Sequence, residues 1–100
     1  MIHSVYFWLT EEAQSKCEEF EAALANLVEI KKIATAYYGS PAKTAARPVT
    51  DHSFDYNLTL VFATQEDHDA YQVHPDHDVF IAQYKTWWSK VLVYDTDTIN

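Results

Sequence analysis

The sequence predicts an α+β domain in which a four-stranded antiparallel sheet carries its helices on one face. Two observations indicate this class. Four segments rich in β-branched and aromatic residues read as strands, and the segments between them place apolar residues at helical spacing. The resulting order is β-α-β-β-α-α-β, the ferredoxin-like split βαβ plan with its second helix broken in two.

The first strand and the first helix have the clearest patterns. Residues 1–9 (MIHSVYFWL) are expected to be extended, because β-branched and aromatic side chains favour strands. Alternation places one set of them toward the helices: His3, Val5, Phe7 and Leu9. The opposite set is Ser4, Tyr6 and Trp8. Thr10 is a suitable N-cap for a helix with an apolar stripe at Ala13, Cys17, Phe20, Leu24 and Leu27.

Three more strands are expected, at residues 33–38 (IATAYY), 54–62 (FDYNLTLVF) and 91–94 (VLVY). A loop at residues 40–53, with two prolines and small polar residues, separates the first two of these. Alternation in the longest strand predicts one apolar face, made of Phe54, Tyr56, Leu58, Leu60 and Phe62.

Two helices are expected between the third and fourth strands. A capping box at residues 64–67 opens a short helix that runs through Tyr71. Pro75 then interrupts the pattern and starts the next helix, since proline is favoured in a first helical turn. The apolar face of this last helix is predicted to be Phe80, Ile81, Tyr84 and Trp88.

Composition limits the function classes. One hundred residues predict a single domain spanning 1–100, and a net charge of −8 disfavours binding to nucleic acid or to a membrane surface. No apolar run is long enough to span a bilayer, nothing resembles an export signal, and the lone Cys17 has no partner for an internal disulfide. A cytoplasmic protein is therefore expected. Without a glycine-rich phosphate loop, a CxxC pair or a serine elbow, no cofactor is predicted.

The sheet face opposite the helices predicts a homodimer. This face carries Tyr6 and Trp8, which is a large apolar area to expose on a small domain. A second copy, packed sheet against sheet, would cover these dimer-interface candidates. The alternative is that both aromatic side chains lie at the rim of the sheet and tolerate water.

Histidine and tyrosine side chains on the helix-facing side define a candidate site. His77 lies three, four and seven residues before Phe80, Ile81 and Tyr84, so it shares their inward face. Burial and the start of a helix both disfavour an imidazolium, so we expect a neutral His77, as a general base requires. His3 and Tyr71 are further catalytic candidates.

The ligand-binding candidates are the side chains expected around the same space: Tyr56, Phe80, Ile81, Tyr84, Val5 and Phe7. Taken singly, an inward histidine or tyrosine is usually a core residue with a satisfied hydrogen bond. No metal site is predicted, because the proline between His74 and His77 gives no known ligand spacing and Asp76 and Asp78 are expected to face solvent. His52 and His68 are expected at the surface.

Several segments together resemble one family. The HPDH element (residues 74–77) after a tyrosine, the F-x-x-x-Y spacing and the closing VLVYD strand (residues 91–95) are similar to the stress-responsive A/B barrel (Dabb) domain family. The opening IHSVYFWL and the segment RPVTDHSFDYNLTLVF are similar as well, so the resemblance covers nearly the whole chain. It implies a ferredoxin-like chain that pairs into a dimeric α+β barrel.

The resemblance also implies three candidate functions. Members include heat- or salt-induced stable proteins, and one plant member is a polyketide cyclase in which a histidine of the HPxH element acts with a tyrosine; these match His77 and Tyr71, while an early histidine matches His3. The first hypothesis is a homodimer that binds a small apolar or aromatic molecule. The second is a cyclase or lyase with His77 as general base and Tyr71 or His3 stabilising an enolate. The third is a structural stress protein without a ligand.

Overall fold

The computed structural model describes all residues, 1–100. The strands are β1 (Ile2–Leu9), β2 (Thr35–Gly39), β3 (Tyr56–Val61) and β4 (Trp88–Thr96). The α-helices are α1 (Cys17–Leu27), α2 (Gln65–Gln72) and α3 (Pro75–Tyr84), and two short 3-10 helices are η1 (Ala13–Lys16) and η2 (Lys85–Trp87). All neighbouring strands pair antiparallel in the order β2-β3-β1-β4, so the predicted ferredoxin-like order is confirmed.

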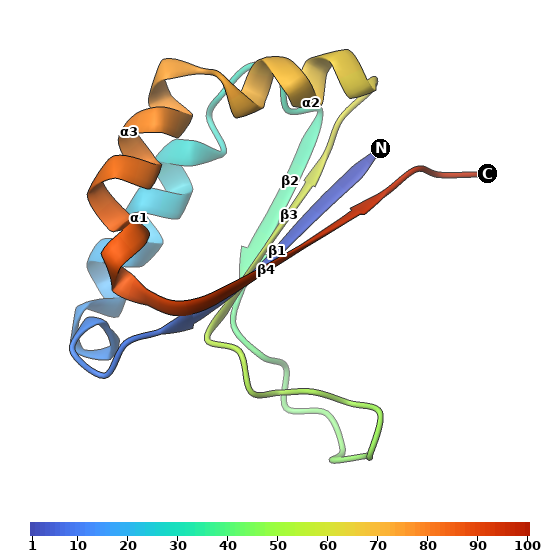
Figure 1. Cartoon of the computed structure of the whole chain (residues 1–100). Helices are drawn as coiled ribbons and strands as arrows, with labels where there is room; N and C mark the ends of the chain where they lie inside the picture. Colours follow the sequence, from blue (N-terminus) through green and yellow to red (C-terminus); the bar gives the residue numbers. More distant parts are fainter.

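The three α-helices all lie on one side of the sheet, and the other side is bare (Figure 1). The segment between β2 and β3 extends away from the body of the molecule as a long loop, as predicted for residues 40–53 (Figure 1). No helix combines the length and the apolar character needed to cross a bilayer.

The core fills the space between α1 and the two central strands. Burial alternates along β1 and β3, with every second side chain buried, as the sequence predicts. Phe20 and Leu24 of α1 meet Leu60 of β3 there, and all three are fully buried. Since burying one large apolar side chain contributes about 1.5–3 kcal/mol, this region supplies much of the fold's stability.

The capping prediction is confirmed at α2 and modified at α1. Thr64 Oγ1 accepts a hydrogen bond from the Asp67 N–H, which satisfies one free donor of the first turn of α2. Thr10 Oγ1 accepts from the Ala13 N–H, but it caps η1, and the α-helix begins only at Cys17. The predicted helix therefore opens with a tighter turn.

Several predicted boundaries are wrong, and the last strand, expected at residues 91–94, is longer in the structure, Trp88–Thr96. Strand β2 begins two residues later than expected, at Thr35, and β3 begins at Tyr56. Phe54 consequently lies on the bare side of the sheet, with its ring 5.0 Å from that of Tyr6. Trp88 does not extend α3, because η2 ends the helix and Trp88 starts β4, paired with Leu9.

Candidate functional site

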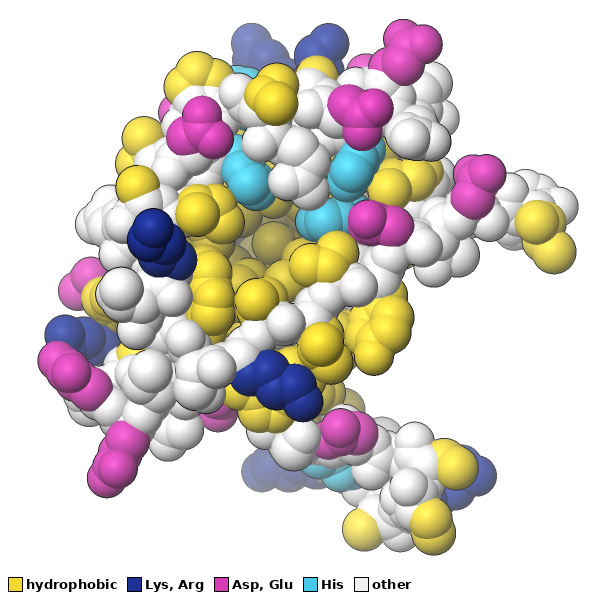
Figure 2. Space-filling model, in the orientation of Figure 1, with side chains coloured by type: hydrophobic (Ala, Val, Ile, Leu, Met, Phe, Trp, Pro, Cys, Tyr) yellow, Lys and Arg dark blue, Asp and Glu magenta, His cyan; other side chains and the backbone are white.

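A cavity of about 180 Å³ lies between the sheet and helices α2 and α3. Figure 2 shows a hollow with hydrophobic walls and histidine side chains at its rim. Ten of its thirteen lining residues are hydrophobic, so the cavity is an apolar space with few polar groups. The lining residues are His3, Val5, Phe7, Leu27, Leu58, Tyr71, Gln72, His77, Phe80, Ile81, Trp88, Val91 and Val93.

The cavity opens at edge strand β4. Val91 and Val93 pair with Phe7 and Val5 of β1, so their side chains point to the helix side of the sheet. They nevertheless remain 38% and 49% exposed. Because valine side chains on the helix side of a sheet are normally buried, their exposure marks a part of this face that the helices leave uncovered.

His77 lies at the wall of this cavity, in the first turn of α3. Its ring meets the Tyr71 ring edge-on, with 4.8 Å between centroids. The Nδ1 atom is buried and makes no hydrogen bond with any other atom of the chain. Burial lowers the pKa of the imidazole below its usual value, and nearby Asp78 only partly opposes this effect. The lowered pKa favours the neutral form of the His77 imidazole, and its Nδ1 has no hydrogen-bond partner in the chain.

Tyr71 comes from the last turn of α2 and is 1% exposed. Loss of solvation on burial raises the pKa of its phenol, so the hydroxyl stays protonated over the physiological range. A protonated phenol at the cavity wall can donate a hydrogen bond to an oxygen of a bound molecule.

His3 completes the polar part of the cavity wall from β1. Its Nδ1 lies 2.6 Å from Asp95 Oδ1, and these two residues are register partners across β1 and β4. Burial lowers the pKa of His3, while the hydrogen bond and charge of Asp95 act in the opposite direction. The carboxylate therefore fixes the ring orientation of a buried imidazole.

The structure brings together most of the predicted site residues but not all of them. His77, Tyr71 and His3 share the cavity with the predicted apolar residues Val5, Phe7, Phe80 and Ile81. Tyr56 and Tyr84 lie outside it, contrary to expectation.

Both tyrosines belong to the packed core around Phe20. The Tyr56 ring lies 5.4 Å from the Phe20 ring, and the Tyr56 hydroxyl donates a hydrogen bond to Glu21 Oε2. Burial is the main cause that raises the pKa of this phenol, and the hydrogen bond to Glu21 raises it further. Tyr84 stacks edge-on against Phe20 at 6.1 Å.

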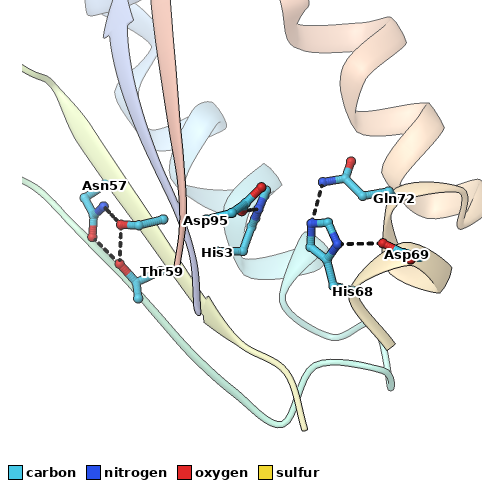
Figure 3. A network of polar contacts seen from close by, with 8 residues as sticks. His3, Asn57, Thr59, His68, Asp69, Gln72 and Asp95 are labelled. Atoms are coloured by element: carbon cyan, nitrogen blue, oxygen red, sulfur yellow. Dashed lines mark hydrogen bonds and ion pairs between the residues drawn. The ribbon is translucent and has the colours of Figure 1, made fainter. Parts of the chain in front are cut away.

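His68 and Asp95 were missed by the sequence analysis, which expected His68 at the surface. The His68 side chain is only 12% exposed, and its ring lies 5.0 Å from His3 and 5.5 Å from Phe62. Figure 3 shows His3 and His68 side by side, each with a carboxylate beside it. A signal did exist for His68, since it lies three residues before Tyr71 and shares its helix face.

The HPDH histidines and aspartates do not gather into a cluster of ligands. His74 instead caps α3, with its Nδ1 accepting from the Asp76 N–H at 3.0 Å. His52 lies in the long loop, with its Nε2 2.8 Å from Thr44 Oγ1. Neither residue lines the cavity.

The bare sheet face has a hollow of its own, about 520 Å³ in volume. Tyr6 and Trp8 line it together with Tyr94 of β4, which is 58% exposed. Trp8 Nε1 donates to Ser53 Oγ of the long loop, and the Lys90 ammonium lies 4.5 Å from the Trp8 ring centroid. Polar side chains interrupt the apolar area, because Ser4, Thr59 and Asn57 form a hydrogen-bonded group on this face (Figure 3).

The fold and the cavity define the class as an α+β ferredoxin-like domain with an open sheet face. The model of the Dabb family, the Stress Responsive A/B Barrel Domain, matches residues 2–98. The chain therefore belongs to this family, as the HPDH and VLVYD segments predicted. No curated protein matches the chain at a significant level.

Solved structures share the fold at low sequence identity. A Dabb family protein from Mesorhizobium loti is 20% identical, with a TM-score of 0.76 over 99% of this chain and 96% of that one. A protein from Thermobifida fusca, described as dimeric, ferredoxin-like and of unknown function, is 20% identical, with a TM-score of 0.74 over 93% and 85%. A hydroxynitrile lyase from Passiflora edulis is 17% identical, with a TM-score of 0.77 over 99% and 95%.

Proposed function

We propose that the protein is a homodimer that binds a small apolar or aromatic compound in the cavity between the sheet and the helices. The unpaired, buried Nδ1 of His77 carries this proposal. Leaving a polar atom buried without a partner costs about 1–3 kcal/mol, and a ligand that lets this imidazole make a hydrogen bond would recover part of that cost.

The size of the cavity sets the size of the compound. A cavity of about 150 Å³ with aliphatic and aromatic walls accepts one benzene ring. The cavity here is of similar volume, about 180 Å³, and it is open beside Val91 and Val93. The ligand class that fits is a single ring with a carbonyl or hydroxyl oxygen, whose remaining substituents extend past β4.

The dimer is the second part of the proposal. Tyr6, Trp8 and Tyr94 present aromatic surface on a sheet face that no helix covers. Several solved relatives with this fold are described as dimeric. A second copy packed on this face would bury the aromatic surface and leave the cavity, on the opposite side of the sheet, free for a ligand.

Ligand binding is tested by a thermal-shift screen of one-ring aldehydes, ketones and phenols. A compound present at one hundred times its dissociation constant stabilises the folded protein by about 2.7 kcal/mol, which raises Tm by roughly 10–20 °C. We expect hits that His77→Phe weakens at least tenfold, because phenylalanine keeps the ring but has no nitrogen. His52→Phe, in the long loop, is the matched control and should bind as the wild type does. Equal binding by both variants would place the ligand elsewhere.

A catalytic function is the second candidate, and the neutral His77 beside the protonated Tyr71 favours it. In this reaction the imidazole takes a proton from a carbon next to a carbonyl group, and Tyr71 donates a hydrogen bond to the negative oxygen of the enolate that forms. The lyase from Passiflora edulis shares this fold. The measurement is the exchange of acidic C–H protons of a bound hit in D₂O, followed by NMR. His77→Gln should abolish exchange while roughly preserving affinity, whereas a binding protein shows no exchange even as wild type.

A further inference from the structure

Three side chains of metal-ligand type meet at the edge of the cavity. His3 comes from β1, His68 from α2 and Asp95 from β4, so segments far apart in the sequence supply them. One donor atom from each residue lies within 4.8 Å of the other two. Figure 3 shows this cluster between the ends of the two strands and the helix.

The surroundings of His68 prepare it as a ligand. Its Nδ1 lies 3.0 Å from Asp69 Oδ1, so this nitrogen carries the proton and donates it to the carboxylate. Its Nε2 accepts a hydrogen bond from the Gln72 side-chain amide at 3.3 Å, so the lone pair of the ring lies on this nitrogen and is available to a cation that displaces the amide. Metal-binding histidines commonly have this arrangement, in which a carboxylate holds the N–H of the ring and the other nitrogen faces the cation.

The contact between His3 and Asp95 supplies the other two donors. Their Nδ1 and Oδ1 atoms are 2.6 Å apart and share one proton. A cation bonded to both atoms at about 2.0–2.2 Å would take the place of this proton, which the neutral imidazole would then carry on Nε2, and would separate the two atoms to roughly 3.3 Å in tetrahedral geometry. This is a small movement for Asp95, whose side chain is 46% exposed.

The local charge also favours a cation. Asp69 and Asp95 place two carboxylates beside the two imidazoles, and neither carboxylate forms an ion pair with a lysine or an arginine.

We propose that His3, His68 and Asp95 bind a divalent transition-metal cation of the zinc class. Two imidazole nitrogens and one carboxylate oxygen are a ligand set that suits such cations and leaves a coordination position for water or another ligand. The site differs from the His74 and His77 set that the sequence analysis rejected. Because His3 and Gln72 also line the cavity, a cation here would lie beside a bound compound. The proposal does not depend on the function proposed above.

The test is a titration of the full-length, tag-free protein with Co²⁺, followed by its visible absorption, and with Zn²⁺ by calorimetry. We expect one equivalent of cation per chain. His68→Phe keeps a ring packed against Phe62 but removes the donor nitrogen, and it should lower affinity at least tenfold. Asp95→Asn should lower affinity about tenfold or more, since it removes the charge that pairs with the cation. His52→Phe, the matched control, should change affinity less than twofold.

Two results would overturn the metal site. One is the absence of saturable Co²⁺ or Zn²⁺ binding by the wild type. The other is a His68→Phe variant that keeps its circular dichroism spectrum and binds the cation as tightly as the wild type does. Neither result bears on the compound screen, which depends on His77 and can be repeated with a chelator present, so the two proposals fail separately.

Discussion

The space between the helices and the sheet has two unlike halves. Over β1 and β3, Phe20, Leu24 and Leu60 are completely buried and the side chains fill the layer. Over β4, Val91 and Val93 also face the helix side, yet they are 38% and 49% exposed beside a cavity. The same sheet face thus forms a packed core at its centre and borders a cavity at its edge. The candidate site residues His3, Tyr71 and His77 line this cavity, where packing is incomplete.

The difference between the halves has a simple geometric cause. Helix α1 covers the centre of the sheet, whereas α2 and α3 meet at an angle over its edge, with residues 73 and 74 between them (Figure 1). The cap that His74 provides for α3, with Pro75 in its first turn, places His77 over the gap rather than over the core. The broken helix therefore creates the cavity and also positions its histidine.

The largest expected effect is on the packed half. Leu24→Ala should lower the free energy of unfolding by about 3 kcal/mol, because it removes three buried carbon atoms and leaves a void. Val93→Ala, on the open half, should cost less than about 1 kcal/mol, since half of that side chain is already in water. Urea denaturation of both variants measures the contrast. Equal losses would mean that the two halves are packed alike.

A change on the bare face tests whether a partner covers it. Trp8→Glu places a charge against apolar surface in the proposed dimer, so it should yield a protein of monomer mass at micromolar concentration, or an unfolded one. Light scattering gives the mass directly, with the wild type expected at the mass of two chains. Glu11→Gln, a change at an exposed position outside this face, serves as the control. A wild-type monomer would contradict the dimer.

The pH dependence of stability should come partly from the open half. Burial lowers the pKa values of both His3 and His77, so the unfolded chain holds protons more tightly than the folded chain. The stability these groups contribute is fully present above the unfolded pKa of about 6.5 and is lost as the pH falls through the lower folded values. The free energy of unfolding should therefore decline from about pH 7 to pH 5.

His77→Phe provides the check on this pH effect. It removes one of the two titrating groups, so its unfolding free energy should decline less steeply over the same range than that of the wild type. His52→Phe, the same substitution in the long loop, is the matched control. An unchanged slope in His77→Phe would show that His77 is as easily protonated in the folded protein as in the unfolded one.

The sequence predicts the packed half better than the open half. Period-two alternation is enough to place Leu9 and Leu60 on the buried face, because each position depends on its own strand alone. The pairing of His3 with Asp95 depends on the register between β1 and β4, which no local pattern contains. Trp88 was assigned to the wrong element for a related reason: helical spacing continued past Tyr84, although the backbone had already turned.

Aromatic residues show the same limit. Tyr56 and Tyr84 were expected at the cavity because they share a face with its walls. Both instead pack against the Phe20 ring of α1, which is distant in sequence, and belong to the core. His68 shows the reverse case, in which a histidine expected in water packs against Phe62 and His3. A face can be read from spacing, whereas the neighbours on that face depend on tertiary packing.

The central claim, that the open half is a binding cavity, is tested most directly by filling it. Val93→Trp adds a large side chain at the mouth of the cavity, where half-exposed Val93 leaves room for it, so the fold should survive. The measurement is the affinity of the one-ring hits for this variant and for the wild type by calorimetry. The account predicts that binding falls at least tenfold in Val93→Trp while the Tm of the free protein changes little. Hits that bind Val93→Trp as tightly as they bind the wild type would contradict it.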